Sequence, residues 1–286
     1  MKKIEPIGTR ISKWGEGPVW LENSLYYVDI KGHSVCRLDP QTGEENDWNV
    51  GEEVGFVVPC ASGKLLCGGD NGFFTLDKDD GSITRIADPE PNLPNNRFND
   101  GKCSPDGRLF AGTIATDKTT GAARLYRMDF DLSWKEVFGP VTNSNGLAWT
   151  KDGKTLYYID SPSKEVKRFD YDANTGGIIG GNAVLDLADE LGIPDGMTID
   201  KEDQLWIAFC HGGRVARFDP KTGRETDRIE IPAHETTSCT FGGPTGQDLY
   251  ITTGIYLKDE EDQGGRVFVV KGLPVGGNTV TLFKDA

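Results

Sequence analysis

The chain has 286 residues, 36% of them apolar and 27% charged, which is enough to bury the core of one large domain or two ordinary ones. Its 45 acidic and 31 basic residues give a net charge of −14, which argues against nucleic acid as a partner because phosphate binding needs local excess Lys and Arg. No stretch of about 18 apolar residues is present and MKKIEPIGTRISKW lacks an apolar signal core, so we expect no membrane partner. The six cysteines form no C-x-x-C pair, which is typical of reduced thiols in a cytoplasmic protein.

Six similar segments follow one another along the chain. NSLYYVD, GKLLCGG, GRLFAGT, GKTLYYID, DQLWIAF and QDLYITT each combine a turn residue, a leucine and alternating apolar positions. Their leucines, 40 to 49 residues apart, are Leu25, Leu65, Leu109, Leu156, Leu205 and Leu249. Units of about 40–50 residues with short strands are typical of propeller blades. The repeat therefore predicts an all-β, six-bladed β-propeller, with four-stranded antiparallel blades around a central channel, over residues 1–286.

The sequence also leads to expectations about the closure of the ring, about a competing fold and about the oligomeric state. The last unit lacks an outer strand, so we expect an N-terminal strand near residues 2–12 to complete it. An array of three β-sandwich domains is the competing interpretation, but no linker-like stretch divides the chain. No outer strand in the sequence indicates an interface with another protein chain, so we expect a monomer.

An aspartate follows the leucine in each of the first five units. An aspartate side chain can accept a hydrogen bond from its own backbone two residues on, which favours a tight turn. We therefore predict structural, turn-opening roles for Asp39, Asp77, Asp129, Asp170 and Asp219.

The first strand of each blade lines the channel of a propeller, so equivalent positions in successive blades face one another. Counting back nine to eleven residues from each repeat leucine reaches a polar residue in five of the six units. Glycines follow four of these positions closely, which lets the strands approach around the axis. The aligned positions are Glu16, Phe56, Asn99 with Asp100, Asn145, Asp195 and Ser238.

Glutamate, asparagine and aspartate oxygens at one end of a channel suit a divalent cation. Ca²⁺, Mg²⁺ and Mn²⁺ prefer such hard ligands, and Zn²⁺ accepts them. Three protein ligands leave positions open for water and substrate, as a catalytic metal requires. Spacing alone does not distinguish this interpretation from residues that tie blades together or hold a purely structural ion.

Other chemistries find little support in the sequence. No G-x-S-x-G elbow and no Gly-rich phosphate loop with a lysine is present. His33, His211 and His234 are the histidines, and none falls at the channel position, so we do not expect a histidine-based zinc site. We interpret His211, in CHGGR, as a loop histidine that follows a second strand.

The sequence resembles the regucalcin and gluconolactonase family of six-bladed propellers. The matching stretches, from residue 15 to about residue 243, are GEGPVW, NNRFNDGKCSPDGRLFAGT, NSNGLAW, YYIDS, IPDGMTID, GGRVARFDPKTG and TTSCTFGG. The resemblance implies hydrolysis of a sugar lactone such as glucono-1,5-lactone or xylono-1,4-lactone. It also implies one divalent metal ion (Ca²⁺, Zn²⁺, Mg²⁺ or Mn²⁺) held by Glu16, Asn145 and Asp195.

The same resemblance implies residues that contact the substrate. The arginine and second asparagine of RFN are Arg97 and Asn99 here. Asp117 falls where related enzymes carry an acidic residue near the substrate, in a loop (ATDKTTGAA) that we expect on the channel face. A second loop near residue 260 carries Asp259, Glu260, Glu261 and Asp262, which we expect to be solvated.

We predict that Asp195 also acts as the general base, which requires a carboxylate oxygen that is free to face the attacking water. Two alternatives remain. In the first alternative, the protein is a calcium-binding propeller without turnover, since a fold does not establish a function. Or it hydrolyses other lactones or organophosphate esters, although the hydrogen-bonding groups favour a polyhydroxylated substrate.

Overall fold

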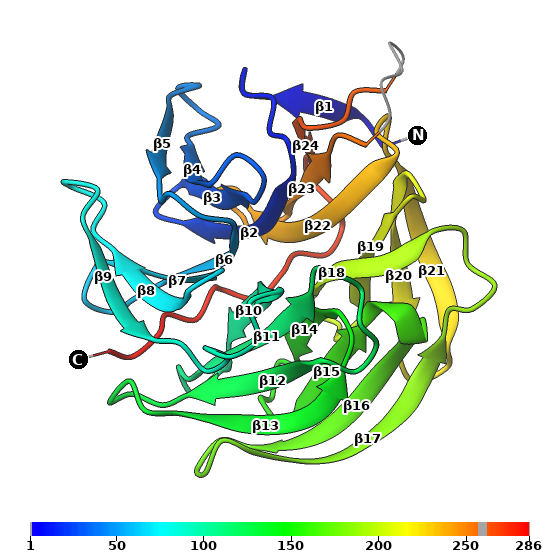
Figure 1. The fold of residues 1–286 in the computed structure, drawn as a ribbon. Coiled ribbons are helices and arrows are strands. Elements are labelled where there is room, and N and C mark those ends of the chain that lie inside the picture. The colour runs from blue at the N-terminus through cyan, green and yellow to red at the C-terminus, as the bar shows by residue number, and fades with distance from the viewer. Residues whose placement is uncertain (1, 257–261, 286) are drawn as a thin grey trace.

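The computed structural model describes residues 2–256 and 262–285 (Figure 1). Over these residues the chain forms 24 strands in six four-stranded antiparallel sheets, arranged as a ring around a central channel. The predicted six-bladed propeller is therefore confirmed, and the sandwich array is wrong. Within the described ranges, no helix has the length and apolar character needed to cross a membrane. Asp259, Glu260 and Glu261 of the predicted solvated loop lie outside the described residues.

The first three blades follow one another along the chain, each built from the channel outward. Neighbouring strands in a blade are consecutive in sequence and pair antiparallel. The strands are β2 (Gly15–Leu21), β3 (Ser24–Asp29), β4 (Ser34–Leu38), β5 (Glu45–Asn49), β6 (Val54–Pro59), β7 (Leu65–Gly69), β8 (Gly72–Leu76), β9 (Ile83–Ala87), β10 (Asn96–Cys103), β11 (Leu109–Ala115), β12 (Ala123–Met128) and β13 (Trp134–Val141).

The last three blades repeat this order, and the final one is closed by the N-terminal strand. β1 (Ile4–Ile7) pairs with β24 (Val267–Val270) in the register Ile4↔Val270, which confirms the predicted closure. A short 3₁₀ turn, η1 (Ser161–Ser163), follows β15. The other strands are β14 (Ser144–Trp149), β15 (Thr155–Asp160), β16 (Glu165–Asp172), β17 (Gly177–Asp186), β18 (Ile193–Ile199), β19 (Leu205–Cys210), β20 (Arg214–Asp219), β21 (Arg224–Glu230), β22 (Glu235–Gly242) and β23 (Asp248–Gly254).

The hydrophobic core lies between neighbouring blades. All six repeat leucines are fully buried (0% exposed), each on the second strand of its blade. One cluster joins Ala148 and Ile159 of the fourth blade to Ile207 and Phe209 of the fifth. Burying such a side chain contributes about 1.5–3 kcal/mol. The alternation in the repeat therefore positions each blade against the next, which orients the inner strands.

Every inner strand carries a β-bulge near its beginning. The register with the second strand skips between Glu16 and Val19 in β2, between Asn145 and Leu147 in β14, and between Pro194 and Met197 in β18. β6, β10 and β22 show the same irregularity. A bulge breaks the strict alternation of side chains and redirects a side chain out of the sheet. The bulges thus occur where the sequence aligned the channel residues.

The turn-opening aspartates are confirmed at some positions and wrong at others. Asp39 accepts a hydrogen bond from the Gln41 backbone at 2.8 Å, and Asp77 and Asp219 form equivalent turns. Asp129 instead binds Arg108 at 2.6 Å and Arg127 at 2.5 Å. Asp170 lies inside β16, which continues to Asp172, and the side chain of Asp172 opens that turn.

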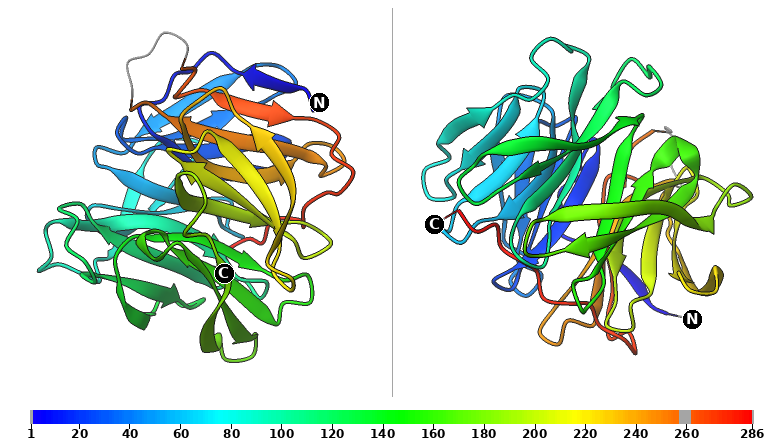
Figure 2. Two further views of the ribbon diagram at one scale, coloured as in Figure 1. Left: turned by 90° about the vertical axis from the view of Figure 1, so that its right-hand side faces the viewer. Right: turned by 90° about the horizontal axis from the view of Figure 1, so that it is seen from below.

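The C-terminal segment crosses the face of the ring opposite to the beginnings of the inner strands (Figures 1 and 2). It is tied to the fifth blade through Lys201 N and Gly276 O at 2.9 Å, and to the second blade through Phe283 N and Pro59 O at 2.8 Å. A cavity of about 310 Å³ lies between residues 278–281 and the inner strands. The segment therefore covers one end of the channel and leaves the other end for ligands.

Candidate active site

The three predicted metal ligands come from three different inner strands. Glu16 lies on β2, Asn145 on β14 and Asp195 on β18, and their exposed fractions are 5%, 2% and 8%. The structure brings them together: the Asn145 side chain favours the ionised form of Asp195, and the charges of Asp195 and Glu16 act on each other. These contacts place a carboxamide and two carboxyl groups at one end of the channel.

Burial and mutual repulsion both disfavour the ionised form of the carboxyls in this group. Burial, followed by the nearby Asp195 and Asp100 carboxylates, raises the pKa of Glu16 well above its usual value. Burial and Asp100 also raise the pKa of Asp195, against an opposing hydrogen bond from Asn145. Lys102 opposes the shift for Asp100, although burial lowers the pKa of that lysine too. Like charges held this close disfavour joint ionisation, and a cation between them relieves that repulsion.

Two buried oxygens in the group have no hydrogen-bond partner among the residues that the structure describes. They are Glu16 Oε1 and Asn145 Oδ1. The remaining atoms are occupied: the Gly17 N–H donates to Glu16 Oε2, and Asn145 Nδ2 donates to Ser161 Oγ at 2.9 Å. An unsatisfied buried acceptor costs about 1–3 kcal/mol. Two such acceptors beside a buried carboxyl fit a hard divalent cation, which prefers oxygen ligands.

Glycines adjoin these ligands because the inner strands approach closely. Gly17 has a φ of +54°, a conformation that other residues rarely adopt, and this lets its N–H reach Glu16. A Cβ on Gly146 would lie 2.8 Å from the Met197 Cβ and 2.9 Å from the Asp195 carbonyl oxygen. The glycine after Asn145 is therefore what allows β14 to bring its ligand to β18.

Arg97 and Asn99 form a connected pair on β10. Arg97 is 9% exposed, and its Nε donates to Glu53 Oε2 at 3.0 Å while Nη1 donates to Asn99 Oδ1 at 2.9 Å. Asn99 Nδ2 donates in turn to Ser144 O at 2.8 Å, next to Asn145. This chain of bonds fixes a guanidinium and a carboxamide beside the predicted metal-ligand residues.

Asp117 lies apart from this network, in the exposed loop between β11 and β12. Its Oδ1 accepts a hydrogen bond from Thr119 N at 3.0 Å, and its Oδ2 accepts one from Asn95 Nδ2 at 2.8 Å. Asn95 immediately precedes β10, so the loop does lie on the channel face where the inner strands begin. The pKa of Asp117 is lowered by the Thr119 hydrogen bonds and by Asn95.

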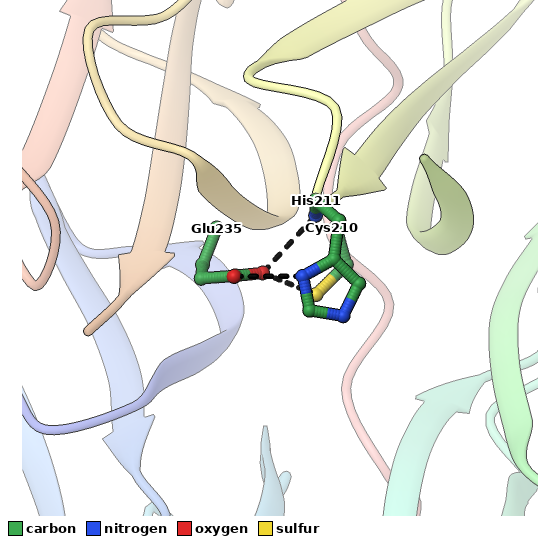
Figure 3. Close-up of side chains that lie close together, drawn as sticks. All are labelled: Cys210, His211 and Glu235. Carbon is green, nitrogen blue, oxygen red and sulfur yellow. Dashed lines mark hydrogen bonds and ion pairs between the residues drawn. The ribbon is translucent and has the colours of Figure 1, made fainter. Parts of the chain in front are cut away.

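Counting back from the repeat leucines did not identify a second polar cluster at the same end of the channel. Cys210 ends β19, His211 follows it, and Glu235 begins β22 (Figure 3). Glu235 is fully buried, and its charge acts on Asp195. His211 is a loop histidine, as predicted, and it lies against this cluster. Glu235 lies three positions before Ser238, so the repeat alignment did not single it out.

Comparisons with known proteins identify relatives of similar sequence and fold. The profile described as the SMP-30/Gluconolactonase/LRE-like region matches residues 14–255. Regucalcin of Xenopus laevis is 40% identical over 293 residues, covering 98% of both chains. A solved luciferin-regenerating enzyme has a TM-score of 0.92 at 32% identity, covering 99% of this chain and 100% of its own. A calcium-binding protein, regucalcin from Agrobacterium tumefaciens, has a TM-score of 0.90 at 27% identity, covering 97% of this chain and 98% of its own.

Proposed function

The chain belongs to the SMP-30/gluconolactonase/LRE-like family, and from that premise we propose that it is a divalent-metal-dependent lactonase that opens a sugar lactone to the aldonic acid. The observation that carries the proposal is the convergence of Glu16, Asn145 and Asp195, with two unpartnered oxygens, beside the Arg97–Asn99 pair. A purely structural ion site has no need of that guanidinium. The proposed substrate is a small molecule, and we propose that the protein is a monomer in the cytoplasm.

Glu16, Asn145 and Asp195 would hold the ion through their side-chain oxygens. Glu16 Oε1 and Asn145 Oδ1 are available for this without breaking any hydrogen bond among the described residues. When bound, a divalent cation supplies Lewis-acid chemistry by withdrawing electron density from the lactone carbonyl. Ca²⁺, Mg²⁺, Mn²⁺ and Zn²⁺ all accept such ligands.

Asp195 is the proposed general base. Its carboxylate accepts a proton from the attacking water as the water oxygen bonds to the carbonyl carbon. The bond from that carbon to the ring oxygen then breaks, and Asp195 returns the proton to the departing ring oxygen. The net change is addition of one water to the lactone. This role requires one Asp195 carboxylate oxygen that is free of the ion and faces the attacking water.

Arg97 and Asn99 are proposed to orient the substrate by hydrogen bonds to its hydroxyl groups. Their mutual bond and the contacts to Glu53 and Ser144 hold both groups before the substrate arrives. Preorganised groups position a substrate with little further loss of entropy. Asp117 would accept a hydrogen bond from a substrate hydroxyl at the outer side of the site, where its side chain is exposed and its pKa is lowered.

The direct test is a pH-indicator assay with glucono-1,5-lactone and xylono-1,4-lactone. Protein stripped with EDTA is compared with protein supplied with Ca²⁺, Mg²⁺, Mn²⁺ or Zn²⁺. Metal-dependent turnover would support the proposal and identify the effective ion. Rates no higher than spontaneous hydrolysis with every ion would remove sugar-lactone hydrolysis on these substrates, and other lactones and organophosphate esters would then be assayed.

Metal binding is expected to stabilise the wild-type protein but much less the Glu16→Gln variant. At a free ion concentration 100 times Kd, binding adds about 2.7 kcal/mol to the free energy of unfolding, which is roughly 5–10 °C in Tm for a domain of this size. Glu16→Gln removes a charged ligand, so the ion-induced rise should shrink by more than half. The measurement is calorimetry with and without the ion.

Glu52→Gln provides the matched control for the Glu16 substitution. Glu52 is also buried, but it binds Arg85 at 2.7 Å on the second blade. Its loss should lower Tm equally with and without the ion. An equal ion-induced rise in the wild-type protein and in Glu16→Gln would contradict the assignment of Glu16 as a ligand.

Arg97→Lys is expected to lower kcat/KM for a sugar lactone about 10- to 100-fold, mainly through KM. A hydrogen bond to a charged group contributes about 1.5–3 kcal/mol, and lysine cannot reproduce the fork that binds Asn99 and Glu53 together. Steady-state kinetics at saturating metal would measure the change. Arg85→Lys, on the outer part of the second blade, is the control and should leave KM unchanged.

A calcium-binding propeller without turnover is the second candidate function. It is favoured by the all-oxygen character of Glu16, Asn145 and Asp195 and by the solved relative that is described as a calcium-binding protein. Isothermal titration separates the two candidates. Tight Ca²⁺ binding together with no hydrolysis of any lactone or ester would favour the binding role.

A further inference from the structure

Cys210, His211 and Glu235 bring a sulfur, a nitrogen and an oxygen donor to one point between the fifth and sixth blades (Figure 3). Glu235 Oε2 accepts hydrogen bonds from Cys210 Sγ at 2.9 Å and from the His211 backbone N–H at 3.0 Å. Glu235 Oε1 lies 2.8 Å from His211 Nδ1. The three donor atoms are all within 4.8 Å of one another. The Glu235 carboxylate thus contacts both the Cys210 thiol and the His211 imidazole.

These donor atoms are close to the spacing of a metal centre. Zinc bonds of about 2.0–2.3 Å in a tetrahedron place neighbouring ligand atoms roughly 3.3–3.8 Å apart. The widest pair therefore needs to close by at most about 1 Å, and the hydrogen-bonded pairs at 2.8 and 2.9 Å need to open by roughly 0.5–1 Å. His211 can supply that movement, because its side chain is 39% exposed whereas the Glu235 side chain is fully buried. His211 therefore lies on the accessible side of the cluster, and Glu235 lies on its buried side.

More than one partner holds the Glu235 carboxyl in place. His234 Nδ1 lies 3.0 Å from the same Glu235 Oε1 that faces His211. Burial opposes its charge, but the hydrogen bonds from Cys210 and His234 keep the pKa of Glu235 below its usual value. Groups that orient a metal-binding carboxylate in this way strengthen its binding. His234 is therefore a positioning residue for Glu235.

We propose that Cys210, His211 and Glu235 form a second metal site, selective for a borderline transition ion of the Zn²⁺ or Co²⁺ type. A thiolate and an imidazole favour such ions, whereas Ca²⁺ and Mg²⁺ require oxygen ligands. On binding, the Cys210 thiol gives its proton to solvent and the sulfur bonds the ion. His211 binds through Nδ1, in the tautomer that carries its proton on Nε2.

The second site lies beside the proposed catalytic one. Burial and the Asp195 charge raise the pKa of the Cys210 thiol, and the Glu235 charge also acts on Asp195. Lys102 and Arg97 are the cations whose charges act on Glu16, and the carboxyls of Glu16, Asp100, Asp195 and Glu235 outnumber them in the described structure. A second cation would reduce that excess. The two sites differ in ligand chemistry, so different ions distinguish them.

The test is titration of EDTA-stripped, full-length protein with Co²⁺, followed by absorption spectroscopy. A thiolate bound to Co²⁺ produces a near-ultraviolet charge-transfer band, which oxygen ligands alone do not produce. The wild-type protein should develop this band and saturate, and excess Ca²⁺ should not remove it. Cys210→Ser should abolish the band. His211→Ala and Glu235→Gln should each weaken Co²⁺ binding about tenfold or more.

Cys239→Ser is the matched control, because Cys239 is also buried near the channel but lies outside the cluster. It should retain the band. Circular dichroism and the Ca²⁺-induced rise in Tm would show that each variant folds. No band in the wild-type protein, or a band that survives in Cys210→Ser, would overturn the proposal. The readout does not depend on turnover, so absence of lactone hydrolysis would leave this inference standing.

Discussion

Asp195→Asn is expected to reduce kcat for lactone hydrolysis on the order of 10²- to 10⁴-fold at saturating metal. An amide cannot accept the water proton, although it has nearly the same shape and retains one oxygen for the ion. Asp195 is 8% exposed and its neighbours Asn145 and Cys210 are held within the strands. The fold should therefore survive the substitution. Steady-state kinetics across a metal titration would separate loss of the base from weaker metal binding.

Asp200→Asn is the matched control for this substitution. Asp200 directly follows β18 and is fully buried, but it binds Arg217 Nε at 2.7 Å and Trp206 Nε1 at 2.9 Å, away from the metal-ligand residues. Its loss should lower Tm while leaving kcat near the wild-type value. If Asp195→Asn retained full kcat once saturated with metal, another group would have to take the proton.

Phe283→Ala is expected to lower the free energy of unfolding by about 3–5 kcal/mol, which is roughly 5–10 °C in Tm for a domain of 286 residues. The ring is 0% exposed and packs among Phe56, Phe98 and Tyr126 of the second and third blades. Its backbone also bonds Pro59 O and Ala61 N, each at 2.8 Å. Losing the ring creates a cavity and loosens the segment that covers the channel. Urea denaturation would measure the change.

Leu282→Ala tests whether the effect belongs to the buried ring rather than to the segment as a whole. Leu282 is the preceding residue and is 36% exposed, so its truncation should cost only about 0.5 kcal/mol. Equal losses for the two variants would mean that Phe283 does not anchor the C-terminal segment as its burial indicates.

Much of the fold could be predicted because each blade repeats one local pattern. Leu25 and its five equivalents are fully buried, since alternation places every second side chain against the next blade. Counting from these leucines found Glu16, Asn145 and Asp195, because equivalent residues of repeated strands reach the same end of the channel. Asp170 shows the limit of local patterns: β16 continues two residues further, where Asp172 opens the turn.

The turns between the first and second strands explain why the counting was only approximate. The repeat leucine pairs with a residue of the inner strand, Trp20 for Leu25 but Trp149 for Leu156, and the turn between the two paired residues differs in length from blade to blade. The alternating pattern does not record where a strand leaves its register. Asp117 likewise has the predicted location on the channel face, but its bonds to Asn95 and Thr119 became apparent only in the folded loop.

By itself, the sequence determined the number of blades, the closure by β1 and the end of the channel at which Glu16, Asn145 and Asp195 lie. These features follow from alternation and repetition, which act over a few residues at a time. The tertiary structure alone decided that Glu235 meets Cys210 and His211, and that the C-terminal segment crosses to Pro59. Those contacts join different blades, and they depend on how the blades are placed when the ring closes.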